Sequence, residues 1–204
     1  MDTAGDLLIE ATASGLDRVL SGVSYALAPN LEQLALTGSA AINGTGNGLN
    51  NLLTGNGGAN VLKGLAGIDS LTGGAGNDQL FGGSANDILT GGNGNDRFIF
   101  DGALGTSNID HVTDFARGLD RLVLDDDIFA RLGVGTATGT SISSANFKVG
   151  AAASDSNDYL IYNPTTDKLL YDSDGNGTRA AVPIATIPLA GTMALAASDF
   201  LLVA

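Results

Sequence analysis

Large apolar residues recur at every ninth position between residues 46 and 99, and glycine, asparagine and aspartate fill most positions between them. The six consecutive units read GNGLNNLLT, GNGGANVLK, GLAGIDSLT, GGAGNDQLF, GGSANDILT and GGNGNDRFI. Their eighth positions are Leu53, Leu62, Leu71, Leu80, Leu89 and Phe98. A period of nine fits neither an α-helix nor a long strand. It predicts a strand of about three residues, with its middle side chain inward, alternating with a turn of about six.

Each turn reverses the chain, so every unit is expected to stack on the unit two further along, eighteen residues away. Stacked strands lie about 4.8 Å apart. The sixth positions then fall into two files, one at each edge of the stack: Asn51, Asp69 and Asp87 in one, Asn60, Asp78 and Asp96 in the other. Thr54, Thr72 and Thr90 should form an outward file, explained either by threonine pairing across strands or by an ice-binding array.

The flanking regions also favour strands, so the expected fold class is all-β, a right-handed parallel β-roll with β-rich flanks. Residues 1–45 hold DLLIEA, LDRVL, VSYAL and LEQLALTG, separated by Gly, Ser, Pro and Asn, and predict a strand-rich N-terminal extension of the roll at residues 46–99. Residues 100–204 predict a β-rich C-terminal cap, with one helical turn in LDDDIFARLG. The start without a capping helix suggests the tail of something longer.

The charge is strongly acidic, with 22 Asp and Glu against 9 Lys and Arg, a formal net charge of −13. All of these acids except Glu10 and Glu32 are aspartates. Aspartate and glycine favour turns, and acids held in turns suit a hard cation such as calcium. Nucleic acid is not an expected partner, because its binding footprint is basic. The alternative is that the charge serves solubility alone.

The stacked aspartates themselves point to a cation. Carboxylates about 5 Å apart repel one another, and more strongly beside an apolar core. Calcium accepts six to eight oxygen ligands, from carboxylates and backbone carbonyls together. Glycines allow positive φ and let the turns direct carbonyls inward. Few large side chains are available for a core, so the roll is expected to need this metal to fold.

The units resemble the RTX, or hemolysin-type, calcium-binding nonapeptide GGxGxDxUx, a known calcium-binding repeat. Gly73–Phe81 and Gly91–Ile99 fit the pattern fully, whereas Gly82–Thr90 departs from it at Ala85 and Gly64–Thr72 at Leu65. Residues 46–54 and 55–63 carry asparagine in place of the acid.

The resemblance implies several calcium ions, each held between one turn and the turn two units on. One ion would take Leu65, Gly67 and Asp69 with Gly82, Ser84 and Asp87. Another would take Gly74, Gly76 and Asp78 with Gly91, Asn93 and Asp96. The pairs of Asn51 with Asp69 and of Asn60 with Asp78 carry less charge, so binding there should be weaker or those turns empty.

Two stretches of the C-terminal region, NIDHVTDFARGLDRLVL and LLYDSDGNGTRAAVPIATI, resemble the end domain of serralysin-type secreted RTX proteins. Asp114 lies eighteen residues after Asp96 and is a candidate to extend its file, joined by Asp110 and Asp120; acids on a solvated strand edge are the alternative. Asp172, Asp174 and Asn176 have the spacing of an EF-hand start, but Pro183 stands at the twelfth place, and a hairpin turn is the other interpretation.

The ending DFLLV, residues 199–203, resembles the uncleaved signal for type I export, which implies the type I secretion machinery as a partner and an extracellular location. The first ten residues, MDTAGDLLIE, show neither a basic nor a long apolar region, so no cleaved signal is expected. No run of about 18 apolar residues predicts a membrane span.

Enzyme motifs are missing from the sequence. It contains neither HExxH nor GxSxG, and its one histidine, His111, is expected on a surface strand. The leading hypothesis is a non-enzymatic secreted module that calcium folds after type I export. The alternatives are the C-terminal part of a larger secreted protease, lipase or mannuronan epimerase, and an adhesin or module that binds extracellular polysaccharide or a cell surface.

Overall fold

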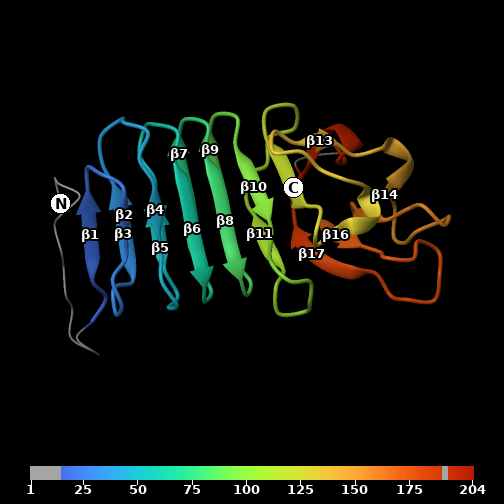
Figure 1. Cartoon of the computed structure of the whole chain (residues 1–204), viewed down its shortest axis with the longest axis horizontal. Coiled ribbons are helices and arrows are strands. Elements are labelled where there is room, and N and C mark those ends of the chain that lie inside the picture. Colours follow the sequence, from blue (N-terminus) through green and yellow to red (C-terminus); the bar gives the residue numbers. More distant parts are fainter. Residues whose placement is uncertain (1–14, 190–192) are drawn as a thin grey trace.

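Two β-sheets face each other along the long axis of the protein, in a computed structural model that describes residues 15–189 and 193–204 (Figure 1). The ten-stranded sheet contains, in spatial order, β1 (Arg18–Ser21), β3 (Gln33–Leu36), β5 (Leu52–Thr54), β7 (Ser70–Ala75), β9 (Ile88–Asn93), β11 (Asp110–Val112), β17 (Val182–Thr186), β16 (Lys168–Tyr171), β15 (Leu160–Asn163) and β14 (Phe147–Val149). The eight-stranded sheet contains β13 (Thr140–Ser141), β18 (Phe200–Val203), β12 (Arg121–Asp125), β10 (Arg97–Phe100), β8 (Gln79–Ser84), β6 (Val61–Ala66), β4 (Gly44–Thr45) and β2 (Tyr25–Ala26). Three short 3₁₀ helices complete the described elements: η1 (Ala130–Leu132), η2 (Ser144–Asn146) and η3 (Ala197–Asp199).

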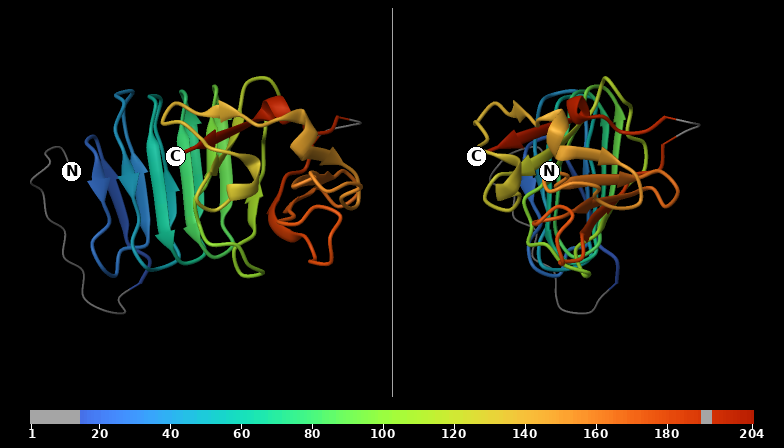
Figure 2. Two further views of the ribbon diagram at one scale, coloured as in Figure 1. Left: turned by 45° about the vertical axis from the view of Figure 1, so that its right-hand side comes forward. Right: turned by 90° about the vertical axis from the view of Figure 1, so that its right-hand side faces the viewer.

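Successive strands alternate between the two sheets, and strands within each sheet are parallel throughout the repeats. Leu53 of β5 is in register with Leu71 of β7, and Leu71 with Leu89 of β9. In the other sheet, Leu62 is in register with Leu80 and Leu80 with Phe98. The predicted stacking interval of eighteen residues and the parallel β-roll are therefore confirmed. The end-on view in Figure 2 shows the coil as a flattened loop with the C-terminal segment at one end.

The strands of the repeats are longer than the pattern indicated. β6 to β9 each span 6 residues, because pairing resumes after the first glycine of the turn. Leu65 pairs with Gly83, and Gly74 with Gly92. Stacked turns are in register with one another, so their backbones bond as the strands do; the Gly76 N–H, for example, donates to Asn93 O at 2.9 Å.

The core is one continuous file of side chains between the sheets. The eighth positions of all six units are 0 % exposed, and the file continues through Leu34 before the repeats and through Val112 and Leu122 after them. Each rung contributes about one large side chain, so the roll buries little apolar area per residue. The interactions that close the turns therefore contribute a larger share of the stability than they would in a protein with a thick core.

The N-terminal strands continue both sheets. β1 and β3 precede β5 in one, while β2 and β4 precede β6 in the other. Of the four N-terminal runs, LDRVL, VSYAL and LEQLALTG overlap β1, β2 and β3, and DLLIEA lies outside the described residues.

The C-terminal region begins as two more rungs and then changes character. β11 stacks on β9 and β12 on β10, but β15, β16 and β17 pair antiparallel. β18 returns to the roll and lies parallel to β12, so the end of the chain in Figure 1 sits beside the repeats. The helical turn expected in LDDDIFARLG is the 3₁₀ helix η1. No helix among the described residues has both the length and the apolar character to cross a membrane.

Candidate metal centre

Four aspartates at the sixth positions of the repeats are buried between stacked turns. Asp69, Asp78, Asp87 and Asp96 are each at most 1 % exposed. Their Oδ1 atoms accept backbone N–H groups from the rung before. Asn51 N–H donates to Asp69 at 2.7 Å, and Asp78 N–H donates to Asp96 at 2.8 Å. The same bonds join Asn60 to Asp78 and Asp69 to Asp87. A ladder of carboxylates thus runs along each edge of the roll.

The second oxygen of each of these carboxylates has no partner within the protein. Oδ2 of Asp69, Asp78, Asp87 and Asp96 is buried without a hydrogen bond. Burying a polar atom unpaired costs about 1–3 kcal/mol, and more for a charged group. Four such atoms at equivalent positions indicate a missing partner of one kind, and that partner has to be positive.

The first glycine of each turn marks the space that such a partner would occupy. A Cβ atom at Gly73 would touch Asp78 Oδ2 and lie 2.6 Å from the carbonyl oxygen of Gly91. A Cβ at Gly64 would touch Asp69 Oδ2 and lie 2.5 Å from Gly82 O. Calcium–oxygen distances are about 2.3–2.6 Å. Glycine at this position therefore leaves room for an ion between a carboxylate and the carbonyl of the next turn.

Other predicted ligands lie in backbone conformations that turn carbonyls toward the neighbouring turn. φ is 81° at Leu65, 105° at Gly67, 108° at Gly74 and 113° at Gly76. A Cβ at Gly83 would touch Leu65 O, and one at Gly94 would touch Gly76 O. Positive φ is strained for leucine, and such strain persists where the surroundings impose it.

Side chains alone do not complete a coordination shell. Within residues 15–189 and 193–204, no group of three or more His, Cys, Asp or Glu side chains converges. Each gap offers two carboxylates, so a calcium ion would draw its remaining ligands from carbonyls such as those of Gly82 and Gly91. This mixture of charged and neutral oxygens is what calcium accepts.

Asn51 and Asn60 occupy the same buried column in the earlier turns, but both ends of their amides are paired. Asn51 Oδ1 accepts the Asn47 N–H at 2.7 Å, and Asn60 Oδ1 accepts the Asn56 N–H at 2.8 Å. Their Nδ2 groups donate to carbonyls of the preceding rung.

Beyond the repeats, the files continue through Asp110 and Asp120 rather than Asp114. Asp110 Oδ1 accepts the Asp87 N–H at 3.1 Å, and Asp120 Oδ1 accepts the Asp96 N–H at 2.9 Å. The intervals have grown to 23 and 24 residues because longer loops connect these rungs. Asp114 instead accepts the N–H groups of Gly91 and Gly92, at 2.9 and 2.8 Å, so it still lies against the turn that ends with Asp96.

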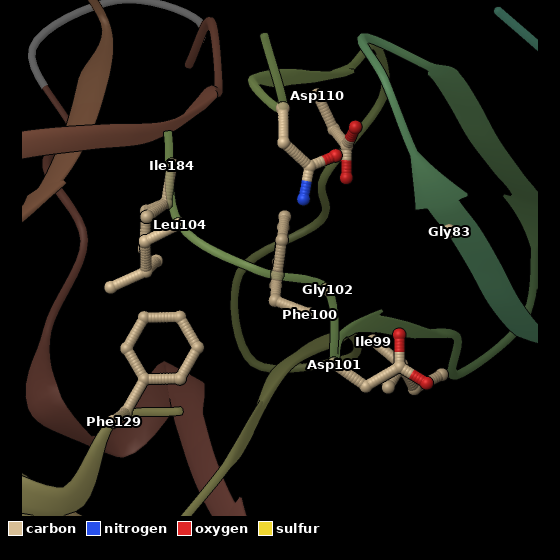
Figure 3. A pocket seen from close by; sticks show the side chains of 10 residues that line it. Gly83, Ile99, Phe100, Asp101, Gly102, Leu104, Asp110, Phe129 and Ile184 are labelled. Carbon is tan, nitrogen blue, oxygen red and sulfur yellow. The ribbon is translucent and has the colours of Figure 1, made fainter. Parts of the chain in front are cut away.

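Asp110 lies in a small cavity between the last repeat and the C-terminal region (Figure 3). Leu104, Phe129 and Ile184 line its apolar side, and Asp101 lies near Ile99. Asn108 Oδ1 also lines this region, buried without a partner, and the nine-residue pattern gave no signal for it because its loop falls outside the frame. Burial raises the pKa of Asp110 to about 7, and the charges of Asp87 and Asp101 add to the rise.

The remaining candidates lie apart from this column. Asp172 and Asp174 lie in the connection between the antiparallel strands β16 and β17, where the Asp174 N–H donates to Asp172 Oδ1 at 3.2 Å; a metal there stays a prediction. His111 is exposed on β11, as expected. The threonine file extends to Thr113, whose hydroxyl lies 2.7 Å from that of Thr90, which favours cross-strand pairing.

Comparison with protein families gives one match. Residues 45–78 and 64–98 match the model of the RTX calcium-binding nonapeptide repeat (4 copies). Residues 45–98 are RTX calcium-binding nonapeptide repeats. RTX repeats bind several Ca²⁺ ions and form a structural rather than catalytic module, of a kind typical of secreted proteins. The match covers about a quarter of the chain and does not extend to the C-terminal region, whose resemblance to serralysin-type proteins stays a prediction. A search of curated proteins returns no match.

The buried carboxylates predict opposite effects of acid with and without calcium. Burial raises the pKa of Asp69, Asp78 and Asp87 to about 6, with a smaller contribution from a neighbouring acid at Asp69 and Asp78. Because these values exceed the unfolded value of about 3.9, the calcium-free fold is stabilised by protonation and loses that stability as the pH rises through about 6.

In metal-stripped buffer we therefore expect the β signal in circular dichroism to grow as the pH falls from about 7.5 to 4.5. With calcium present, protons compete for the same oxygens, so calcium affinity should fall over that range. A calcium-free β signal that weakens steadily on acidification would contradict this account.

Proposed function

We propose that this chain is a secreted calcium-binding module whose roll folds when calcium enters the gaps between its turns. The observation that carries the proposal is the set of four buried, unpartnered Oδ2 atoms. Without a cation, each gap brings carboxylates and carbonyls together with no positive partner. Calcium binding then supplies free energy that the thin core does not.

The ligands follow from the two complete pairs of aspartate turns. At one edge of the roll, Leu65, Gly67 and Asp69 would hold one ion together with Gly82, Ser84 and Asp87. At the opposite edge, Gly74, Gly76 and Asp78 would do so with Gly91, Asn93 and Asp96. The unpaired oxygens of Asp69 and Asp78 face the carbonyls of Gly82 and Gly91 respectively, and this supports both assignments. Asp114 would support the second site by holding the Gly91 and Gly92 N–H groups of the turn that ends with Asp96.

The difference in calcium concentration between the cytosol and the outside of the cell would control when this module folds. Extracellular calcium modules bind with dissociation constants of about 10⁻⁴–10⁻³ M, far above cytosolic calcium. Inside the cell the net charge of −13 and the unneutralised turns would oppose folding. Outside, millimolar calcium would favour it.

Calcium titration tests the folding step. We expect the circular dichroism of the full chain to change from coil to β as calcium rises. Asp78→Ala and Asp87→Ala should each shift the midpoint at least several-fold upward, because each removes a charged ligand from a gap. Asp127→Ala is the matched control: it removes the same charge from an exposed turn, and it should leave the midpoint nearly unchanged. A complete β signal in excess chelator at neutral pH would refute the proposal.

Export of the unfolded chain through a type I system is the second part of the proposal. In the folded protein three of the five residues resembling an export signal are buried, and Leu201 and Val203 are half-buried. Asp199 is buried in an ion pair with Arg117 at 2.8 Å, and Phe200 and Leu202 are buried in β18. These residues are accessible only before folding, which suits a signal read from an unfolded chain.

Co-expression with a type I transporter tests this part. We expect the full chain in the medium and a chain lacking residues 199–203 retained in the cells. Arg117→Ala weakens the same ion pair but keeps the signal residues, so it should be exported normally. Equal export of the truncated chain would rule out this signal.

A second candidate function, binding of acidic polysaccharide, is favoured by one hollow beside the calcium turns. Its volume is about 460 Å³, and its lining includes Gln79, Arg97 and Arg121 beside Asp78 and Asp96, whose charge the bound calcium would offset. Gln79, Arg97 and Arg121 are in register on three adjacent strands. Two stacked arginines on a strongly acidic chain would suit the regularly spaced carboxylates of such a polymer.

Calorimetry with oligomannuronate in calcium buffer tests this candidate, with dextran oligomers as the neutral comparison. We expect binding of the acidic oligomer that Arg97→Ala and Arg121→Ala each weaken at least several-fold, whereas Arg18→Ala, at an exposed position of β1, should not. Absence of binding by the calcium-loaded chain would remove this candidate and leave calcium-driven folding untouched.

A further inference from the structure

Two kinds of turn alternate with the strands of the roll, and they differ at their second and sixth positions. The asparagine turns, residues 46–51 and 55–60, have Asn at both positions. The aspartate turns, residues 64–69, 73–78, 82–87 and 91–96, have Asp at the sixth position and Gly or Leu at the second. The family pattern describes the second kind only.

In the first asparagine turn the two amides form a closed network. Asn47 Nδ2 donates to Ala28 O at 2.9 Å and to Leu31 O at 2.7 Å, both in the preceding rung. Asn51 Nδ2 donates to Leu31 O at 3.3 Å and to Asn47 Oδ1 at 3.2 Å. Every contact places an N–H donor against an oxygen, so the network needs no ion.

The second asparagine turn, at the opposite edge, repeats this network. Asn56 Nδ2 donates to Thr37 O at 3.1 Å and to Ala40 O at 3.0 Å. Asn60 Nδ2 donates to Ile42 O at 2.5 Å and to Asn56 Oδ1 at 3.1 Å. The repetition at two independent turns indicates a built arrangement rather than a chance contact.

The backbone differs between the two kinds of turn in a matching way. At the second position φ is positive in all four aspartate turns, as at Leu65 (81°) and Gly92 (96°), whereas Asn47 and Asn56 have negative φ. In the asparagine turns the second N–H points inward and donates to the sixth side chain. In the aspartate turns the equivalent carboxylate oxygen stays unpaired.

We propose that the paired asparagines close the turns 46–51 and 55–60 in place of calcium, and that the second and sixth positions together decide whether a turn takes an ion. This inference rests on the proposed calcium function. In the asparagine turns the neutral amide N–H groups are the partners of the carbonyl oxygens, as the cation is in the aspartate turns. The calcium requirement therefore begins at residue 64, and the turns before it are closed by hydrogen bonds.

Adding charge to the asparagine turns separates this proposal from weak calcium binding there. In Asn51→Asp and Asn60→Asp a carboxylate oxygen replaces a buried donor. We expect an unchanged calcium count per chain by equilibrium dialysis, and a melting temperature in saturating calcium lowered by roughly 2–10 °C. Asn50→Asp, an exposed neighbour with the same charge change, should alter neither value. An additional bound calcium with an unchanged or higher melting temperature would overturn the proposal.

Crystals of the unaltered chain grown with calcium, and soaked with Tb³⁺ for anomalous scattering, decide the matter even if these variants fail to fold. We expect ions between the paired aspartate turns and none against the amides of residues 46–51 or 55–60. Ion density at those amides would overturn the proposed closure by asparagine but leave the proposed calcium function standing. If the aspartate turns also held no ion, the proposed calcium function would be refuted, and with it the contrast between the two kinds of turn.

Discussion

A carboxylate oxygen buried among carbonyls, with no donor in reach, is the interaction on which the rest of the structure depends. Asp69, Asp78, Asp87 and Asp96 each present one such atom at the same place in successive turns. In the proposed function a cation, rather than the thin apolar file between the sheets, offsets the cost of burying them. The glycines, the positive φ values and the register of the turns all become intelligible as means of keeping this space open for a cation and surrounding it with oxygens.

The asparagine turns show that the fold has a second solution to the same problem. There the surplus of acceptors is met by side-chain amides, and the strained backbone conformation at the second position is not needed. Leu65 is informative for this reason: a leucine held at φ 81° follows the aspartate pattern although the residue itself disfavours it. The backbone conformation at the second position therefore follows the residue type at the sixth position more closely than the local preference of the second residue itself.

Much of the roll could be predicted from the sequence because one period controls it. The recurrence of Leu53 to Phe98 at nine residues fixes the inward face, the alternation between sheets and the stacking interval. Where the period breaks, spacing in the sequence no longer predicts which residues stack on one another. Asp114 stands at the expected interval from Asp96, yet longer loops bring Asp120 into the file. Asn108 lies in a loop outside the frame, and the amide networks of Asn47 and Asn56 depend on carbonyls of rungs that carry no repeat signal.

The ladder of Oδ1 contacts has a direction. The backbone N–H at residue 51 depends on a side chain at residue 69, that at residue 69 on residue 87, and that at residue 87 on residue 110. Within this ladder each N–H is completed by a carboxylate nearer the C-terminus, so loss of material from that end would strand a buried turn N–H. Loss from the N-terminal end would strand other donors, because the Ser70 N–H donates to Asn51 O and the amides of Asn47 and Asn56 donate to carbonyls of earlier rungs. Shortening the roll from its two ends would therefore expose chemically different groups.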